Sequence, residues 1–564
     1  MPWRKTMSLQ PQTDITIPEQ THTIACAAFP KGNLYMKMQD ELGTLFTDEQ
    51  FADLFPKCGQ PAQAPWRLAL VTVMQFVEGL SDRQAAESVR SRIDWKYALA
   101  LELTDPGFDF SVLCEFRARL LDGQAELRLL ETLLTLARSR GWLKAGGKQR
   151  TDSTHVLAAV RALNRIECVG ETLRHALNTL AVVAPDWLSG YLRAEWVDRY
   201  AKRFASIRLP QQKAEREELA LTIGADGFEV MALLQQADAP SALWALPEVQ
   251  TLRQVWVQNY AFVEDKLTWR DTKDMPPAAQ SINSPHDPEA RYSIKRDTTW
   301  SGYKVHFTET CDEDSPHLID HVQTTPATTQ DGQVTAIVHA DLKEANLLPE
   351  RHLVDEAYLD AELLVESPRA YGIDLYGPVA REGSWQAVAD QGFAQSQFAI
   401  DWEAEQVTCP RGKTSRSWKP QKDAAANDVI AVKFSVTDCQ ACAVQAQCTR
   451  SRSGRRELGI RPKEQYLALQ AARARQKTRV FLKEYGLRAG IEGTLSQGIR
   501  TCGMRRSRYV GEVKTHLQHV AIATALNLLR IVSWLMGIPL AKTRQSPLVA
   551  LSHRKSGQMT PVPA

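Results

Sequence analysis

The spacing of apolar residues in the first quarter of the chain predicts helices. Across residues 65–139, apolar side chains recur every three or four positions, which places them on one face of a helix. Ser81 and Gln84 match the capping box, in which the two residues satisfy backbone amides at a helix start. The preceding helix is expected to end at Gly79. Two helices joined by such a short turn fit either a helix-turn-helix or an ordinary helical hairpin.

Strand patterns begin where this helical region ends. Residues 302–310 alternate apolar and polar side chains, which predicts a half-buried strand. Two shorter strand-like segments contain Asp152 or end at Asp355. Helical spacing returns at residues 461–495 and 512–535. Strands and helices that follow one another in this way predict an α/β fold, preceded by an all-helical N-terminal domain.

Two stretches interrupt the expected α/β domain. Residues 158–290 are helical and end in a proline-containing linker, and residues 383–456 are mixed in character and hold a cysteine cluster. The expected organisation is a flexible arm (1–40), a helical N-terminal domain (41–145), an α/β domain with these two insertions (146–540) and a disordered tail (541–564).

Basic residues are concentrated towards the end of the chain. Residues 450–564 hold 22 Lys and Arg against 5 Asp and Glu, a charge of +17, whereas the whole chain carries only +2. A basic surface of this kind attracts a polyanion, because neutralising phosphates releases their counterions. The alternative is an ordinary solvated surface. The interleaving of the charges with Tyr485, Tyr509 and several glycines favours a nucleic-acid partner.

The composition is that of an ordinary globular protein, with 44% hydrophobic and 24% charged residues. The most apolar stretch, Val520–Leu540, contains Asn527 and Arg530 near its middle, which favours a core helix over a membrane span. The first residues lack the apolar stretch of a secretory signal. We therefore expect a cytoplasmic protein without a membrane partner.

Four of the ten cysteines, Cys409, Cys439, Cys442 and Cys448, cluster in the chain. In a cytoplasmic protein such clustering suggests a metal before a disulfide. Four thiolates could bind a zinc ion, and its role would be structural because four protein ligands leave no open position. The alternative is a set of reduced cysteines in a small insertion.

Three acidic residues are candidates for a second metal site. Asp152 and Asp355 lie in strand-like segments, and Glu492 shares one helical face with Arg488 and Tyr485 through spacings of three and four. Carboxylates held close together repel one another unless a cation lies between them. Mg²⁺ prefers oxygen ligands, so three converging carboxylates would suit it. Their spacing alone does not bring them together.

Short motifs at four places resemble the DDE insertion-sequence transposases of bacteria. The motifs are Thr151-Asp152-Ser-Thr-His155, Gly302-Tyr-Lys-Val-His306, Val354-Asp355-Glu-Ala-Tyr358 and Arg488-Ala-Gly-Ile-Glu492, followed by Gly503–Tyr509 and Lys514–His519. Each motif alone is weak, but their order and joint occurrence are specific. Within that class the chain is most similar to insertion-sequence group eleven-eighty-two, which has a Cys-rich insertion. The resemblance covers about Leu42 to Trp534.

The resemblance implies an RNase H-like mixed sheet with flanking helices, in which Asp152, Asp355 and Glu492 are the catalytic and metal-binding residues. They would hold two Mg²⁺ ions, for which Mn²⁺ can substitute, to activate the attacking oxygen and stabilise the leaving one. Tyr485, Arg488 and Glu492 match the family's Tyr-x2-Arg-x3-Glu signature. The expected DNA contacts are Tyr485, Arg488, Arg500, Arg505, Arg506, Arg508 and Lys514.

The function implied by the resemblance is DNA transposition. The enzyme would bind the terminal inverted repeats of its element, hydrolyse the phosphodiester at each end and join the freed 3′-hydroxyl to target DNA. Both ends are joined at once, so a homodimer is expected. The protein would be associated with the bacterial nucleoid. Its N-terminal helices would bind DNA or form the dimer contact. Two alternatives stay open: a non-catalytic DNA-binding remnant of a transposase, and a Mg²⁺-dependent structure-specific nuclease that does not join ends.

Overall fold

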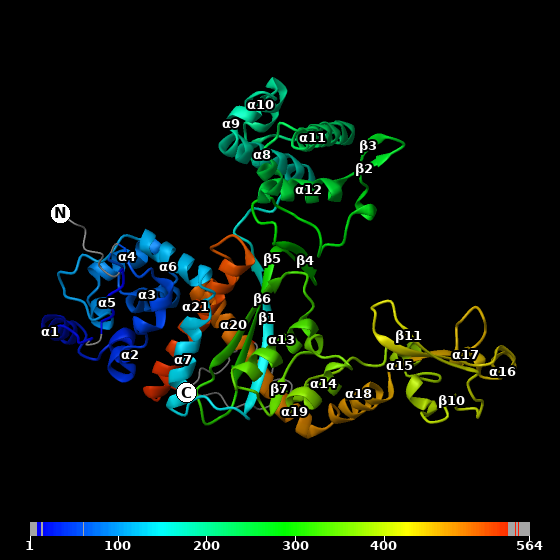
Figure 1. Cartoon of the computed structure of the whole chain (residues 1–564). Coiled ribbons are helices and arrows are strands. Elements are labelled where there is room, and N and C mark those ends of the chain that lie inside the picture. The colour runs from blue at the N-terminus through cyan, green and yellow to red at the C-terminus, as the bar shows by residue number, and fades with distance from the viewer. Residues whose placement is uncertain (1–7, 13–14, 60, 540–546, 549–550, 552–564) are drawn as a thin grey trace.

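The computed structural model describes residues 8–12, 15–59, 61–539, 547–548 and 551. A six-stranded mixed sheet lies at its centre (Figure 1). Its strands are β1 (Lys148–Leu157), β4 (Arg291–Lys295), β5 (Thr298–Thr310), β6 (Ile319–Pro326), β7 (Arg351–Leu353) and β8 (Asp374–Tyr376). The fold is therefore α/β, as the sequence predicts. The expected disordered tail, residues 541–564, falls largely outside the described residues.

The strands of this sheet run in two directions around β1. β1 pairs antiparallel with β5, in a register that sets Asp152 opposite Phe307. It pairs parallel with β7, which in turn pairs parallel with β8. The beginning of β5 pairs with β4 and the rest pairs with β6, both antiparallel. Successive side chains along a strand point to opposite faces, so Arg150 and Asp152 share a face and Ser153 lies on the other.

Helices cover both faces of the sheet. α21 (Glu512–Leu535) packs against β6 and the N-terminal helices, and α13 (Asp331–Glu344) also packs against β6. Polar positions of β5, including His306 and Thr308, are therefore as buried as the apolar positions between them. The prediction of a half-buried strand at residues 302–310 is wrong in this respect, because packing on both sides removes the second face from water.

The N-terminal region is helical, as predicted. Its helices are α1 (Glu19–Ala28), α2 (Leu34–Leu42), α3 (Pro65–Glu78), α4 (Asp82–Ser91), α5 (Ile93–Ala98), α6 (Ser111–Asp122) and α7 (Arg128–Ser139). The capping box of Ser81 and Gln84 is present at the start of α4. Helices α1 and α2 contradict a flexible arm over residues 1–40, because Thr21 Oγ1 donates to the carbonyl of Leu101 at 2.8 Å and Met38 is fully buried. Residues 1–7, 13 and 14 of that range lie outside the described residues.

The N-terminal helices and the sheet share one hydrophobic core. It includes Trp66 and Phe76 of α3, Val305 of β5 and Leu526 of α21. The apolar stretch that begins at Val520 is thus part of a buried core helix. None of the helices in the described ranges is long and apolar enough to cross a membrane.

The stretch between β1 and β4 forms a helical unit with a core of its own. Its elements are α8 (Arg165–Val183), α9 (Pro185–Ser189), α10 (Ala194–Tyr200), α11 (Lys213–Leu233), α12 (Pro247–Asn259), β2 (Tyr260–Val263) and β3 (Lys266–Trp269). Trp196, Leu252 and Trp256 belong to this second core. Figure 1 shows the unit at the top, projecting beyond the end of the central sheet.

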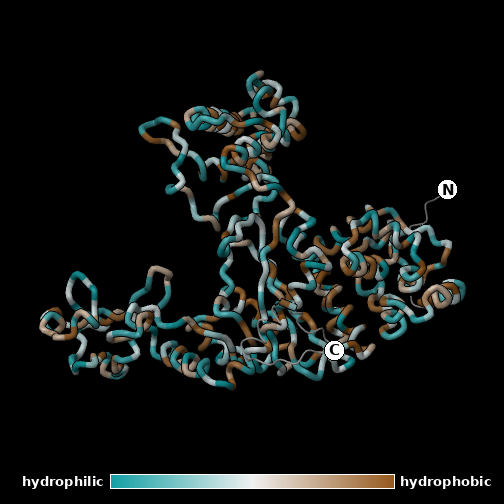
Figure 2. The backbone as a smooth tube through the Cα atoms, turned by 180° about the vertical axis from the view of Figure 1, so that it is seen from behind, coloured by the Kyte–Doolittle hydropathy of each residue, from teal (hydrophilic) through white to brown (hydrophobic). Residues whose placement is uncertain are grey.

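The Cys-containing stretch forms a third, smaller unit. Its elements are α15 (Trp385–Ala389), β9 (Ala399–Asp401), β10 (Gln406–Thr408), β11 (Ser417–Lys422), β12 (Asp428–Lys433), α16 (Val436–Gln440), α17 (Gln445–Cys448) and β13 (Glu457–Ile460). Phe398 and Val432 belong to its small core, against which Cys409, Cys439 and Cys448 pack. Figure 2 shows this unit and the helical unit as two arms that extend from the central body.

The helix expected at residues 461–495 is interrupted. α18 (Lys463–Arg475), which packs against α14 (Leu363–Glu366), is followed by α19 (Arg479–Tyr485) and α20 (Gly490–Cys502). A short 3-10 segment, Gly486–Ala489, joins the last two helices. Glycines at both edges of this segment weaken a continuous helix, because glycine loses the most backbone freedom on folding. α20 runs on to Cys502, so Arg500 is part of the helix.

Candidate active site

Three acidic residues from different elements meet at one guanidinium group. Asp152 lies on β1, Asp355 follows the neighbouring strand β7, and Glu492 is in the first turn of α20. Arg488 Nη2 lies 2.7 Å from Asp152 Oδ2 and 3.8 Å from Asp355 Oδ2. Arg488 Nη1 lies 3.1 Å from Glu492 Oε1. The structure therefore gathers all three predicted carboxylates around Arg488.

The pairing of β1 with β7 explains how the two aspartates come together. Arg150 is paired with Leu353 in the parallel register, and Asp152 and Asp355 each follow two residues later. Asp355 also accepts a hydrogen bond from the backbone amide of Glu356, which caps the following 3-10 turn. Adjacent parallel strands therefore deliver both carboxylates to the same edge of the sheet.

The three carboxylates differ in their exposure to solvent. The side chain of Asp152 is 16% exposed, against 48% for Asp355 and 64% for Glu492. Burial raises the pKa of Asp152; Arg488 opposes the rise and Asp355 adds to it. Burial works against the charge of Arg488, but the combined attraction of Asp152 and the other nearby acidic groups outweighs burial and raises the pKa of the guanidinium. The ionised form of Asp152 thus depends on a nearby cation.

The chemistry of the donor set fits a hard divalent cation, because every ligand would be a carboxylate oxygen. In this structure the positive charge between the carboxylates belongs to Arg488. Among the described residues, no group of three or more His, Cys, Asp or Glu side chains is arranged to hold a metal ion. Arg488 Nε is buried and has no hydrogen-bond partner in the described ranges.

Four of the predicted DNA-contact residues lie on α20, on α21 or in the segment between these helices. Arg500, Arg506 and Lys514 are exposed. Arg505 donates from Nε to Thr154 Oγ1 at 2.9 Å, which holds its side chain beside β1, two residues beyond Asp152. Arg505 thus adds a positive charge beside the strand that bears Asp152.

Two other predicted contact residues take part in packing. Arg508 donates to the carbonyl of Leu80 at 2.6 Å and lies over the ring of Phe76, which links the segment after α20 to the N-terminal helices. Tyr485 is half-buried and stacks on Phe481, with 5.4 Å between the ring centroids. Both side chains therefore have packing partners, and a DNA contact by either of them stays a prediction.

His306 and Tyr358 form a buried pair that the sequence did not assign to the site. His306 Nδ1 lies 2.6 Å from the hydroxyl of Tyr358, three residues after Asp355. Burial lowers the pKa of His306 to about 3, so its imidazole is neutral and bonds the hydroxyl without a charge. The available signal was that each residue closes one of the motifs, Gly302–His306 and Val354–Tyr358.

The four clustered cysteines lie in the same small unit. All ten cysteines of the chain are free thiols. Burial raises the pKa of the Cys448 thiol, which is near enough to Cys409, Cys439 and Cys442 to feel their charge. Zinc binding by these four residues stays a prediction.

Two family models match parts of the chain. A model described as Transposase DDE domain matches residues 408–532, and one described as Transposase domain (DUF772) matches residues 25–119. The two matches support a DDE transposase. Arg488 and Glu492 lie inside the first match, whereas Asp152 and Asp355 lie outside both. No curated protein and no solved structure matches the chain.

A transposase DDE domain implies an enzyme that cuts and transfers DNA in transposition, a form of DNA recombination. DNA is the partner that follows from this activity, in agreement with the +17 charge of residues 450–564. Transposases of this family generally use divalent metals. The carboxylates around Arg488 are candidate ligands for such a metal.

Proposed function

We propose that this transposase binds the terminal inverted repeats of an insertion sequence, hydrolyses the phosphodiester at each element end and joins the freed 3′-hydroxyl to target DNA. The observation that carries the proposal is the gathering of Asp152, Asp355 and Glu492 around Arg488, which is 336 positions from Asp152 in the chain. Carboxylates held in one place repel one another, so their convergence is costly unless they share a cation.

The strand order supports an RNase H-like sheet for the catalytic domain. β6, β5 and β1 are successive antiparallel neighbours, and β7 and β8 extend the sheet from β1 in parallel. The small unit at residues 383–456, with its four cysteines, supports membership of insertion-sequence group eleven-eighty-two.

In this proposal Asp152, Asp355 and Glu492 would hold two Mg²⁺ ions. Bound Mg²⁺ supplies positive charge that activates an attacking oxygen and stabilises a leaving one. Arg488 would exchange its carboxylate partners for a DNA phosphate, for which its planar guanidinium is suited. The low exposure of Asp152 would limit the access of bulk water to its side of the site.

The surface around the site would contact DNA through its basic residues. Arg500, Arg505, Arg506 and Lys514 would neutralise phosphates of the element end. The N-terminal helices would contribute to repeat recognition or to dimerisation. Because both element ends must be joined in one event, we propose a homodimer in the synaptic complex, acting at the bacterial nucleoid.

An end-cleavage and strand-transfer assay tests this function. Purified protein is incubated with Mg²⁺ and labelled DNA that carries the repeats flanking the coding sequence, and cleavage at the repeat ends followed by joining is expected. Asp152→Asn, Asp355→Asn and Glu492→Gln each lower cleavage by about a hundredfold or more, because each removes a metal ligand. Glu344→Gln, an exposed carboxylate at the end of α13, is the matched control and keeps full cleavage.

The same assay separates the alternatives. Cleavage that needs no repeats and gives no joined product would identify a structure-specific nuclease. Repeat binding without cleavage would identify a non-catalytic DNA-binding protein. Wild-type cleavage by all three carboxylate variants would reject the triad.

A further inference from the structure

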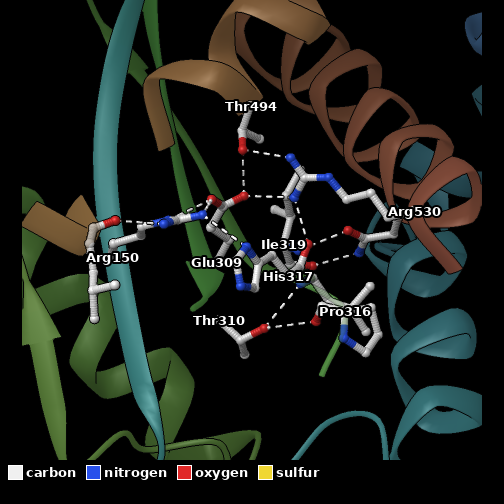
Figure 3. A network of polar contacts seen from close by, with 11 residues as sticks. Arg150, Glu309, Thr310, Pro316, His317, Ile319, Thr494 and Arg530 are labelled. Atoms are coloured by element: carbon white, nitrogen blue, oxygen red, sulfur yellow. Dashed lines mark hydrogen bonds and ion pairs between the residues drawn. The ribbon is translucent and has the colours of Figure 1, made fainter. Parts of the chain in front are cut away.

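A buried cluster of charged side chains lies on the same sheet face as Asp152 (Figure 3). Glu309 of β5 is fully buried and is paired across the sheet with Arg150 of β1. Arg150 Nε donates to Glu309 Oε1 at 2.7 Å, and Arg530 Nη1 of α21 donates to Glu309 Oε2 at 2.7 Å. One buried carboxylate therefore joins a strand of the sheet to the longest C-terminal helix.

This cluster holds the segment that bears Arg488 and Glu492 at two points. On one side, Arg150 Nη1 donates to the carbonyl of Leu487 at 2.5 Å. On the other side, Thr494 Oγ1 donates to Glu309 Oε2 at 2.6 Å and accepts from Arg530 Nη2 at 2.5 Å. The two contacts lie immediately before Arg488 and two residues after Glu492. Figure 3 shows Thr494 pointing from α20 towards Glu309 and Arg530.

The close approach of Arg150 depends on a glycine at the start of α20. A Cβ placed on Gly490 would lie 2.0 Å from Arg150 Nη1, far inside van der Waals contact. The guanidinium is held there by Glu309 and by the carbonyl of Leu487, so it is not free to swing away. The 3-10 segment and the first turn of α20 are thus packed directly onto the buried charges.

The need for such support follows from the exposure of Glu492. Its side chain is 64% exposed, and its carboxylate pairs with Arg488 of the same segment. In the proposed function Arg488 exchanges its carboxylate partners for a DNA phosphate. The position of Glu492 relative to Asp152 and Asp355 then depends on the backbone of the segment. Besides the apolar packing of the helix, polar partners on that backbone and on the next turn are Arg150, Glu309 and Arg530.

We propose that Arg150, Glu309, Thr494 and Arg530 form a positioning network that sets Glu492 in register with Asp152 and Asp355 for divalent-metal binding. The inference rests on the proposed metal-dependent function. These four residues touch neither metal nor DNA. Their contacts with the Leu487 carbonyl and the Thr494 hydroxyl hold the two ends of the segment that bears Arg488 and Glu492.

Thr494 is the residue at which this proposal can be tested without unpairing a buried charge. Thr494→Val removes the hydroxyl but keeps the shape, and leaves Glu309 paired with both arginines. Thr494→Ser restores the hydroxyl. Thr524→Val is the matched control, because Thr524 is a buried threonine of α21 that donates to the carbonyl of Val520 in its own helix.

The measured quantity is the dissociation constant for Mn²⁺ in the absence of DNA. It is obtained from the electron paramagnetic resonance signal of free Mn²⁺ during a titration. Loss of a partner outside the ligand set weakens metal binding by about tenfold or more. We expect this loss in Thr494→Val, near-complete rescue in Thr494→Ser and no change in Thr524→Val. Circular dichroism melting verifies that each variant folds.

The outcomes separate the network from the function on which it rests. If Thr494→Val binds Mn²⁺ as tightly as Thr524→Val, the positioning network is overturned while the metal site stands. If the wild type binds no Mn²⁺, or Asp152→Asn and Glu492→Gln bind it as tightly as the wild type, the metal site and the network are both rejected.

Discussion

Arg488 donates a hydrogen bond to Asp152 at 2.7 Å, across 336 positions of the chain. The same guanidinium lies within ion-pair distance of Asp355 and Glu492. A single positive charge thus offsets three carboxylates, and any divalent cation bound by them must compete with it. This competition leads to the first prediction.

Replacing Arg488 by Gln is expected to tighten Mn²⁺ binding in the absence of DNA, by about fivefold or more, because a competing charge at ion-pair distance is removed. The same substitution is expected to lower DNA cleavage, because a phosphate-binding guanidinium is lost. Mn²⁺ titration and the end-cleavage assay measure the two effects. Arg479→Gln, exposed at the start of α19, is the control for Mn²⁺ binding; weaker binding by Arg488→Gln would contradict the competition.

Gly490 and Gly486 offer a matched pair of substitutions in one segment. Gly490→Ala is expected to lower the free energy of unfolding by about 1–3 kcal/mol, the usual range for overpacking, because its Cβ meets Arg150 at 2.0 Å. Gly486→Ala meets nothing within 4 Å and is expected to be neutral or slightly stabilising. Urea unfolding measures both. Equal stability of the two variants would show that Arg150 can move aside.

The buried pair of His306 and Tyr358 gives a third prediction. Tyr358→Phe leaves His306 Nδ1 without its partner at 2.6 Å, and is expected to cost about 1–3 kcal/mol of unfolding free energy. Tyr292→Phe, on the exposed part of β4, is the control and should change stability little. Urea unfolding compares the free energies of unfolding of the two variants. An equally small loss in both would contradict a stabilising role for the His306–Tyr358 hydrogen bond.

The helical unit between β1 and β4 is expected to lose stability in acid through Glu171. Burial raises the pKa of this carboxyl, but hydrogen bonds from His286, Arg174 and the Phe204 amide outweigh it and lower the pKa to about 2. A carboxyl with a folded pKa below its ordinary 4.5 contributes stability that is complete above pH 4.5 and is lost as pH falls towards 2. The contribution is of order 3 kcal/mol.

Tryptophan fluorescence during urea unfolding can follow this loss, because Trp196 and Trp256 lie in the core of the unit. Glu171→Gln should flatten the fall in stability between about pH 5 and pH 3. Glu195→Gln, an exposed carboxylate of α10, should leave it unchanged. The same acid dependence in Glu171→Gln and in the wild type would rule out Glu171 as its source.

Local features of the fold were accessible from the sequence. The capping box of Ser81 and Gln84 is formed within one helical turn, so its two residues predict it directly. The apolar stretch of α21 needs only its own composition to be assigned to the core. The break between α19 and α20 was missed, because glycines at 486 and 490 alone do not tell a tolerated helix position from an interruption.

Features that depend on distant partners were not accessible. The helix α1 looked like part of a loose arm, because the partner of Thr21 is the carbonyl of Leu101, 80 positions away. Glu309 looks like an ordinary polar position in a strand. Its buried charge is met by Arg150 and by Arg530, which comes 221 positions later in the chain.

The sequence by itself determined the alternation of elements, the residue types of the candidate site and the basic charge of the last 115 residues, since all of these are properties of neighbouring positions. Tertiary structure alone decided that Asp152, Asp355 and Glu492 meet at Arg488. It also decided that Glu309 lies buried between Arg150 and Arg530. The physical reason is that strand pairing and helix packing join positions hundreds of residues apart. A buried charge such as that of Glu309 is stable only where oppositely charged partners from distant parts of the chain pair with it.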